Sequence, residues 1–88
     1  MYYVYILHCA DGKLYTGYSS DLKKRIEKHQ KGFVRSTKSK LSIRLIYYEA
    51  FIEEKDAKQR ELYLKGGNGK KEIEVMLQSY FEKTPWIK

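Results

Sequence analysis

The chain has little cysteine and no long apolar run, and each absence excludes a class of protein. Cys9 is the single cysteine among 88 residues, so no intramolecular disulfide can form, and a reducing cytoplasm fits this composition. The apolar run from Tyr2 to Leu7 is too short to span a membrane, and it lacks the charged n-region and cleavage site of a signal peptide. We therefore expect a cytoplasmic protein with no membrane partner.

Common metal and phosphate motifs are also missing. The chain has two histidines, His8 and His29, and together with Cys9 they do not have the spacing of a zinc site. No glycine-rich loop precedes a helix with Lys-Ser or Lys-Thr, as nucleoside triphosphate binding would require. Residues 66–69 are glycine-rich, but they lie between two predicted helices. We expect a flexible break there.

Positive charge and tyrosine are abundant. The 18 Lys and Arg residues against 11 Asp and Glu give a formal net charge of +7, which favours a polyanionic partner such as nucleic acid. Nine tyrosines supply a small core with large contact area and polar tips. A length of 88 residues suits one domain, residues 1–88.

Three segments have the aromatic and β-branched composition of strands: residues 2–9, 14–16 and 42–51. Asp11-Gly12 predicts a turn that joins the first two strands into an antiparallel hairpin, and we expect the second strand to stop at Gly17. Helices are predicted from Leu22 to Gly32, over residues 53–65, and as one last helix from 68 or 69 through Phe81. The predicted fold class is α+β, a three-stranded antiparallel sheet flanked by helices in the order β-β-α-β-α-α.

Two of these helices place polar side chains beside apolar ones. Helical spacing puts His29 on the face of Leu22 and Ile26, with Arg25 next to it. This arrangement predicts a polar partner for these side chains near Tyr15. In the second helix, Glu61 shares a face with two apolar residues, Ala57 and Leu64.

These side chains suit phosphodiester hydrolysis. Arg25 would neutralise the phosphoryl oxygens, and Glu61 would hold a Mg²⁺ or Mn²⁺ ion that polarises the same group. Tyr15 would contact or deprotonate the attacking water, for which its pKa would have to fall from about 10. Each residue also has a structural interpretation. Tyr5 and Tyr15 would be core tyrosines, Arg25 would pair with Glu61, and His29 would bond a backbone carbonyl.

Basic side chains gather on the first helix and in the polar loop that follows it. We expect them to contact the phosphate backbone of a nucleic acid, although a solvated surface loop is an equal alternative. The six residues are Lys23, Lys24, Lys28, Arg35, Lys38 and Lys40.

The order and spacing of the tyrosine motifs resemble the GIY-YIG nuclease family. The pattern is Tyr3-Val4-Tyr5, then Tyr15-Thr16-Gly17, then Asp21-Leu22-x-x-Arg25-x-x-x-His29, and it extends to Glu61. The resemblance implies the predicted sheet and metal-dependent cleavage of DNA at one active site, consistent with a role in DNA repair or recombination. By position it implies that Tyr5 and Tyr15 are the two motif tyrosines and that Arg25 is the catalytic arginine. It likewise implies that His29 is an assisting histidine and that Glu61 is the metal ligand.

The resemblance leaves target choice and turnover open. Family members usually gain their target from an attached recognition domain, so we expect structured or damaged DNA as the substrate, or a partner protein that supplies targeting. Tyr18 follows Gly17 where the excision-repair members carry a lysine. A non-catalytic basic nucleic-acid-binding module with the same fold is the main alternative, and a protein-interaction domain that uses the tyrosine-rich surface is a third.

Overall fold

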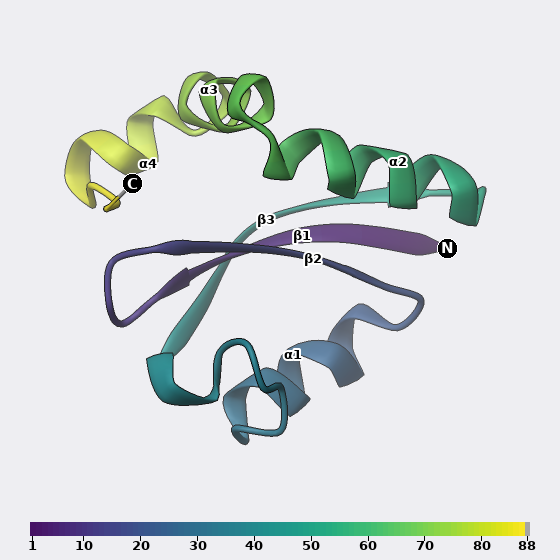
Figure 1. The fold of residues 1–88 in the computed structure, drawn as a ribbon, viewed down its shortest axis with the longest axis horizontal. Helices are drawn as coiled ribbons and strands as arrows, with labels where there is room; N and C mark the ends of the chain where they lie inside the picture. The colour runs from purple at the N-terminus through teal and green to yellow at the C-terminus, as the bar shows by residue number, and fades with distance from the viewer. Residues whose placement is uncertain (88) are drawn as a thin grey trace.

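The computed structural model describes residues 1–87 and confirms the predicted fold class, with helices on both faces of a three-stranded antiparallel sheet of order β2-β1-β3 (Figure 1). None of its helices is long and apolar enough to cross a membrane. The elements, in chain order, are β1 (Tyr2–Cys9), β2 (Leu14–Ser19), α1 (Leu22–Gln30), the 3-10 helix η1 (Lys38–Lys40), β3 (Ile43–Phe51), α2 (Glu54–Lys65), α3 (Gly67–Met76) and α4 (Gln78–Lys83). Residue 88 of the expected domain lies outside the described residues.

Strand β1 lies in the centre of the sheet, and its side chains alternate between two packed layers. Val4 and Ile6 are buried with residues of α2 and α3, which cover one face together with α4. Tyr5 and Leu7 are fully buried and point to the other face, which α1 and the loop after it cover (Figure 1). Because β1 is paired on both sides, the position of Tyr5 is fixed from two directions.

Strand β2 continues two residues past Gly17, so the prediction that it ends there is wrong. Gly17 pairs with Tyr5 across the β1–β2 ladder, and Tyr18 and Ser19 pair with Val4 and Tyr3. A Cβ atom at position 17 would overlap the Cζ and hydroxyl of Tyr5. Glycine therefore does not interrupt this strand. It makes room for the aromatic ring on the neighbouring strand.

Helix α1 begins and ends as its sequence predicts. The Asp21 carboxylate accepts a hydrogen bond from the Lys24 backbone N–H at 3.1 Å, which is an N-cap. At the other end Gly32 has a φ of +77°, and the N–H of Phe33 donates to the Lys28 carbonyl at 2.9 Å. This is the Schellman arrangement, which glycine favours because it has no Cβ. Both ends of the helix that carries Arg25 and His29 are thus fixed.

The C-terminal helices differ from the prediction in two ways. The single predicted helix is divided at Leu77, whose φ of −112° and ψ of 29° are not helical, so that α3 and α4 are separate. The break lets the Tyr80 hydroxyl reach Nδ1 of His8 at 2.6 Å, while Met76 stays 36% exposed outside the packing face. The glycine-rich segment is also no flexible break. Gly69 is buried in the first turn of α3, where a Cβ would overlap the α2 backbone.

Replacement of Gly17 by alanine should destabilise the protein, because the new methyl group would displace the Tyr5 ring from a fully buried site. We expect the free energy of unfolding to fall by about 1–3 kcal/mol, the usual cost of overpacking a core. Urea denaturation of the wild type, Gly17→Ala and Gly67→Ala tests this. A Cβ at Gly67 meets no atom within 4 Å, so equal losses in the two variants would contradict the role assigned to Gly17.

Candidate active site

The Tyr5 hydroxyl lies at the centre of a hydrogen-bonded cluster beneath β2. Its oxygen is 2.8 Å from Nε2 of His29 and accepts a hydrogen bond of 3.2 Å from Nε of Arg25. The other ring nitrogen of His29, Nδ1, is 2.7 Å from Oγ1 of Thr37. Tyr5, His29 and Thr37 are each 0% exposed. Strand β1, helix α1 and the loop before η1 therefore meet at this one hydroxyl.

The buried histidine is uncharged at neutral pH. Burial and the nearby positive charge of Arg25 lower the pKa of His29 from 6.5 to about 4. Burial raises the pKa of Tyr5 to about 12, so this phenol keeps its proton. One proton arrangement satisfies every group: Tyr5 donates to Nε2 of His29, and the Nδ1–H of His29 donates to Thr37. The Tyr5 oxygen then accepts from Arg25. His29 thus bonds two side chains, those of Tyr5 and Thr37. The structural alternative, in which His29 bonds a backbone carbonyl, is not what the structure shows.

Tyr15 extends the cluster along the edge strand β2. Its ring centroid is 6.3 Å from that of Tyr5 and 5.2 Å from that of His29, so the two motif tyrosines share one face as expected. Tyr15 is partly exposed, whereas Tyr5 is not. Of the two motif tyrosines, Tyr15 is therefore the one whose side chain solvent reaches.

Arg25 remains fully protonated and is only partly buried. Its hydrogen bond to Tyr5 is the main cause that raises its pKa, and Tyr15 contributes further. One side of Arg25 lines a shallow hollow of about 320 Å³ whose other lining residues include Lys24 and Lys28 of the same helix. Asp21, whose carboxylate caps α1, lines the hollow as well, so three cations and one carboxylate leave it with a net positive charge, which suits an anionic ligand.

Glu61 reaches the same region from the opposite face of the sheet. It lies on α2, and its charge is among the causes that raise the pKa of Tyr5. The Glu61 carboxylate pairs with Lys65 at 3.1 Å, and its side chain is 20% exposed. Ala57 and Leu64 on its face are fully buried, as predicted. The alternative in which Arg25 pairs with Glu61 is not what the structure shows, since Arg25 bonds Tyr5 instead.

The donor set at Glu61 suits Mg²⁺ or Mn²⁺ held by few protein ligands. Within residues 1–87, no group of three or more His, Cys, Asp and Glu side chains is placed to hold a metal ion. The Glu61 carboxylate is paired with Lys65, so an ion would have to share it with that ammonium or displace it. One carboxylate fits a hard cation that keeps several of its waters and takes further oxygen ligands from a phosphate. Among the five candidate residues Glu61 is the one carboxylate, so it is the one that would hold such an ion.

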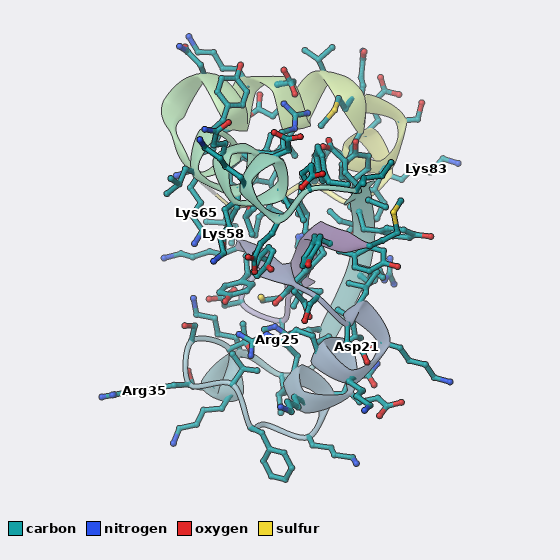
Figure 2. The ribbon with its side chains drawn as sticks, turned by 90° about the vertical axis from the view of Figure 1, so that its right-hand side faces the viewer. Asp21, Arg25, Arg35, Lys58, Lys65 and Lys83 are labelled. Atoms are coloured by element: carbon teal, nitrogen blue, oxygen red, sulfur yellow. The ribbon has the colours of Figure 1, made fainter. Side chains whose placement is uncertain are left out.

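The six basic residues predicted to bind nucleic acid separate into groups. Lys24 and Lys28 lie in the hollow beside Arg25, whereas Lys23 lines another groove on the far side of α1. Lys40 pairs with Asp11 at 3.8 Å. Lys38 is exposed in η1, and Arg35 projects from the loop into solvent (Figure 2).

Sequence reasoning missed residues that only the fold brings to the site. Thr37 comes from the basic loop, and no local pattern distinguishes it as the partner of His29.

Two cations of α2, Lys58 and Lys65, point to the same side of the molecule as Arg35 (Figure 2). In that view Arg25 lies below the two lysines and above Arg35. The Lys58 ammonium lies 5.4 Å from the ring centre of Tyr18, which itself donates a 2.6 Å hydrogen bond to Glu54. A cation therefore adjoins Tyr18, the residue that follows Gly17.

Comparisons with known proteins show which family the chain is similar to. The family model described as the GIY-YIG catalytic domain matches residues 1–74, a range that contains all five candidate residues. The chain is 38% identical over 76 residues to a UPF0213 protein of Staphylococcus saprophyticus, covering 85% of this chain and 93% of that one. It is 42% identical over 66 residues to a UPF0213 protein of Clostridium perfringens, covering 74% and 71%.

A solved structure has a similar fold. It is the solution NMR structure of a UPF0213 protein from Bacillus halodurans, 35% identical in sequence, with a TM-score of 0.55. The similarity covers 86% of this chain and 85% of that one.

Acid should destabilise the protein through His29. The unfolded chain protonates this residue near pH 6.5 and the folded chain only near pH 4, so the unfolded state binds more protons between these values. The His29 contribution is complete above pH 6.5 and is lost as the pH falls toward 4. At one pKa unit per about 1.4 kcal/mol, the loss between pH 7 and 4.5 should reach about 2–3 kcal/mol.

Denaturant unfolding of the wild type and His29→Gln at both pH values measures this loss, because glutamine keeps a donor and an acceptor but does not titrate. All other titratable residues are the same in the two proteins. A pH dependence as steep in the variant as in the wild type would exclude His29 as the group responsible.

Proposed function

Because the chain belongs to the GIY-YIG nuclease family, we propose that residues 1–88 form one metal-dependent endonuclease domain that hydrolyses DNA phosphodiester bonds. The observation that supports this most is the Arg25–Tyr5–His29 cluster. It holds a permanent cation at the edge of a concave basic surface, with Tyr15 next to it and Glu61 across the strand. A structural ion pair would have placed a carboxylate against Arg25. Tyr5 leaves its positive charge uncompensated.

In this proposal Arg25 binds the scissile phosphate. Its Nε is used for Tyr5, so the terminal guanidinium nitrogens donate to a phosphoryl oxygen, on which charge accumulates as water attacks phosphorus and the bond to the leaving oxygen breaks. Tyr5 and neutral His29 keep the guanidinium in place. Neither carries a charge that would compete with the phosphate.

Tyr15 is the side chain that meets the attacking water. It is partly exposed and lies beside Arg25, so a water bound at the phosphate would be within its reach. Glu61 would hold the metal, Mg²⁺ or Mn²⁺. When bound, this ion supplies positive charge that stabilises the phosphoryl and leaving oxygens. Family members are generally metal-dependent, which agrees with this assignment.

The substrate in this proposal is DNA, bound mainly through its backbone. Lys24 and Lys28 contact phosphates beside Arg25, and Lys58 of α2, which also pairs with Glu54 at 3.7 Å, lies over the ring of Tyr18 in the lining of the same hollow. Such contacts carry little sequence preference, so structured or damaged DNA, or a partner protein, selects the target. One site per chain implies that a monomer cuts one strand, in the cytoplasm, in a process of DNA repair or recombination.

Cleavage should require all three groups proposed to act on the phosphate or the water. We expect Tyr15→Phe, Arg25→Lys and Glu61→Gln each to lower the rate of cutting of branched DNA and supercoiled plasmid by about 100-fold or more with Mg²⁺, as loss of a transition-state donor does. Gel assays under single-turnover conditions measure the rate, and omission of metal should abolish it.

Matched variants control for the change of side chain. Tyr48→Phe, Arg44→Lys and Glu53→Gln alter exposed residues outside the cluster and should keep the wild-type rate. If the wild type binds DNA but does not cut it with any divalent cation, the non-catalytic binding module replaces the nuclease.

DNA affinity should fall steeply with salt. Each lysine that neutralises a phosphate contributes about one unit to the slope of log K against log salt, so Lys24→Ala and Lys28→Ala should each reduce the slope by about 1. Lys83→Ala should leave it unchanged, since Lys83 projects from the other side of the molecule (Figure 2). Fluorescence anisotropy of labelled duplex DNA without metal, at several salt concentrations, tests this. Salt-independent binding would exclude backbone recognition.

A further inference from the structure

The C-terminal segment folds back and walls a cavity beside the candidate active site. We call this the tail cavity; its volume is about 410 Å³ and it is lined by, among others, Lys13, Tyr15, Lys65, Lys70, Ile73 and Trp86. Two contacts hold the segment in place. The Ile87 N–H donates to the Gly12 carbonyl at 2.8 Å, and the ring of Trp86 lies 6.2 Å from that of Phe81. The segment is thus part of the fold.

The tail cavity adjoins the residues proposed to act on the phosphate. Tyr15 lines it, and Lys65, another lining residue, pairs with Glu61. A group in the cavity would therefore lie beside Tyr15 and close to the Lys65–Glu61 pair. The cavity lies on the α2–α3 side of β2, whereas Arg25 lies on the α1 side, so one chain of DNA that crosses the edge strand would reach both.

The lining has the chemistry of a nucleotide site. Apolar surface from Ile73 and an indole from Trp86 suit a flat aromatic group. Lys13 and Lys70 form no ion pair with any residue from 1 to 87, so their charges are available to phosphates on either side. An apolar peptide or a lipid tail would not need the lysines, and a bare phosphate would not need the apolar wall. A nucleotide of the DNA uses both.

We propose that the tail cavity binds one unstacked nucleobase of the DNA substrate, next to the scissile phosphate, with Trp86 as its stacking surface. The inference rests on the proposed function for the nature of the ligand. It makes an exposed base, as found at a flap, bulge, junction or single strand, a determinant of cleavage position. Fully paired DNA would first have to unstack a base at an energetic cost.

Trp86 is the one tryptophan of the chain, so its fluorescence reports on the cavity directly. The titrants are an oligothymidylate and a fully abasic strand of the same length and charge, without Mg²⁺ so that neither is cut. We expect the oligothymidylate to quench the fluorescence saturably and to bind at least about five-fold more tightly than the abasic strand, the lower range for loss of a base–aromatic stack. Equal quenching and affinity for the two strands would overturn the proposal.

Variants separate the base contact from the phosphate contacts. Trp86→Ala should abolish the preference for the strand that carries bases, measured by anisotropy, whereas Trp86→Phe should keep it. Lys70→Ala should lower the affinity for both strands by the same factor, and by more than Lys83→Ala does. The proposal would be overturned if Trp86→Ala still bound the oligothymidylate more tightly than the abasic strand. It would also be overturned if Lys70→Ala and Lys83→Ala lowered the DNA affinity by the same amount. These binding measurements need no cutting, so they are independent of the proposed nuclease activity. A protein that prefers the strand with bases but never cleaves DNA would contradict only the proposed function. A protein that cleaves DNA but shows no such preference would contradict only the proposed base binding in the tail cavity.

Discussion

The close contact between the Tyr5 ring and the backbone at Gly17 is the constraint on which the site depends. It sets the Tyr5 hydroxyl beneath the edge strand, where Arg25 donates to it and His29 lies 2.8 Å away. A buried phenol and a buried neutral imidazole then hold a charged guanidinium without neutralising it. The outcome is a cation held at the surface by hydrogen bonding, and in the proposed mechanism this matters because electrostatic catalysis needs charge placed before the reaction begins.

The sheet order explains how residues of the proposed site come from both faces of the sheet. Because β2 is an edge strand, α1 and α2 reach the same edge from opposite sides, with Arg25 on one and Glu61 on the other. The tail contributes a third wall through Trp86. A central strand could not be approached in this way. The edge thus combines a cation, a carboxylate and a phenol along one line.

Local pattern predicted the strands, the caps of α1 and the face of Glu61, because each is determined by residues within a few positions. It failed where a distant part of the chain decides. Gly17 looks like a strand end, but the Tyr5 ring of the neighbouring strand makes it a strand interior. Leu77 interrupts an otherwise continuous helical pattern so that Tyr80 meets His8. Thr37 carries no signal, since its role exists only once the loop folds over His29.

The central claim is that the Tyr5 hydroxyl acts by holding Arg25 at the phosphate. The most direct test is the single-turnover cleavage rate of Tyr5→Phe at saturating protein with Mg²⁺, together with its Kd for the same DNA without metal. The account predicts a rate at least about ten-fold lower, with Kd within about two-fold, because the lost hydrogen bond orients a charge that is still present. An unchanged rate would contradict it, as would a loss confined to Kd.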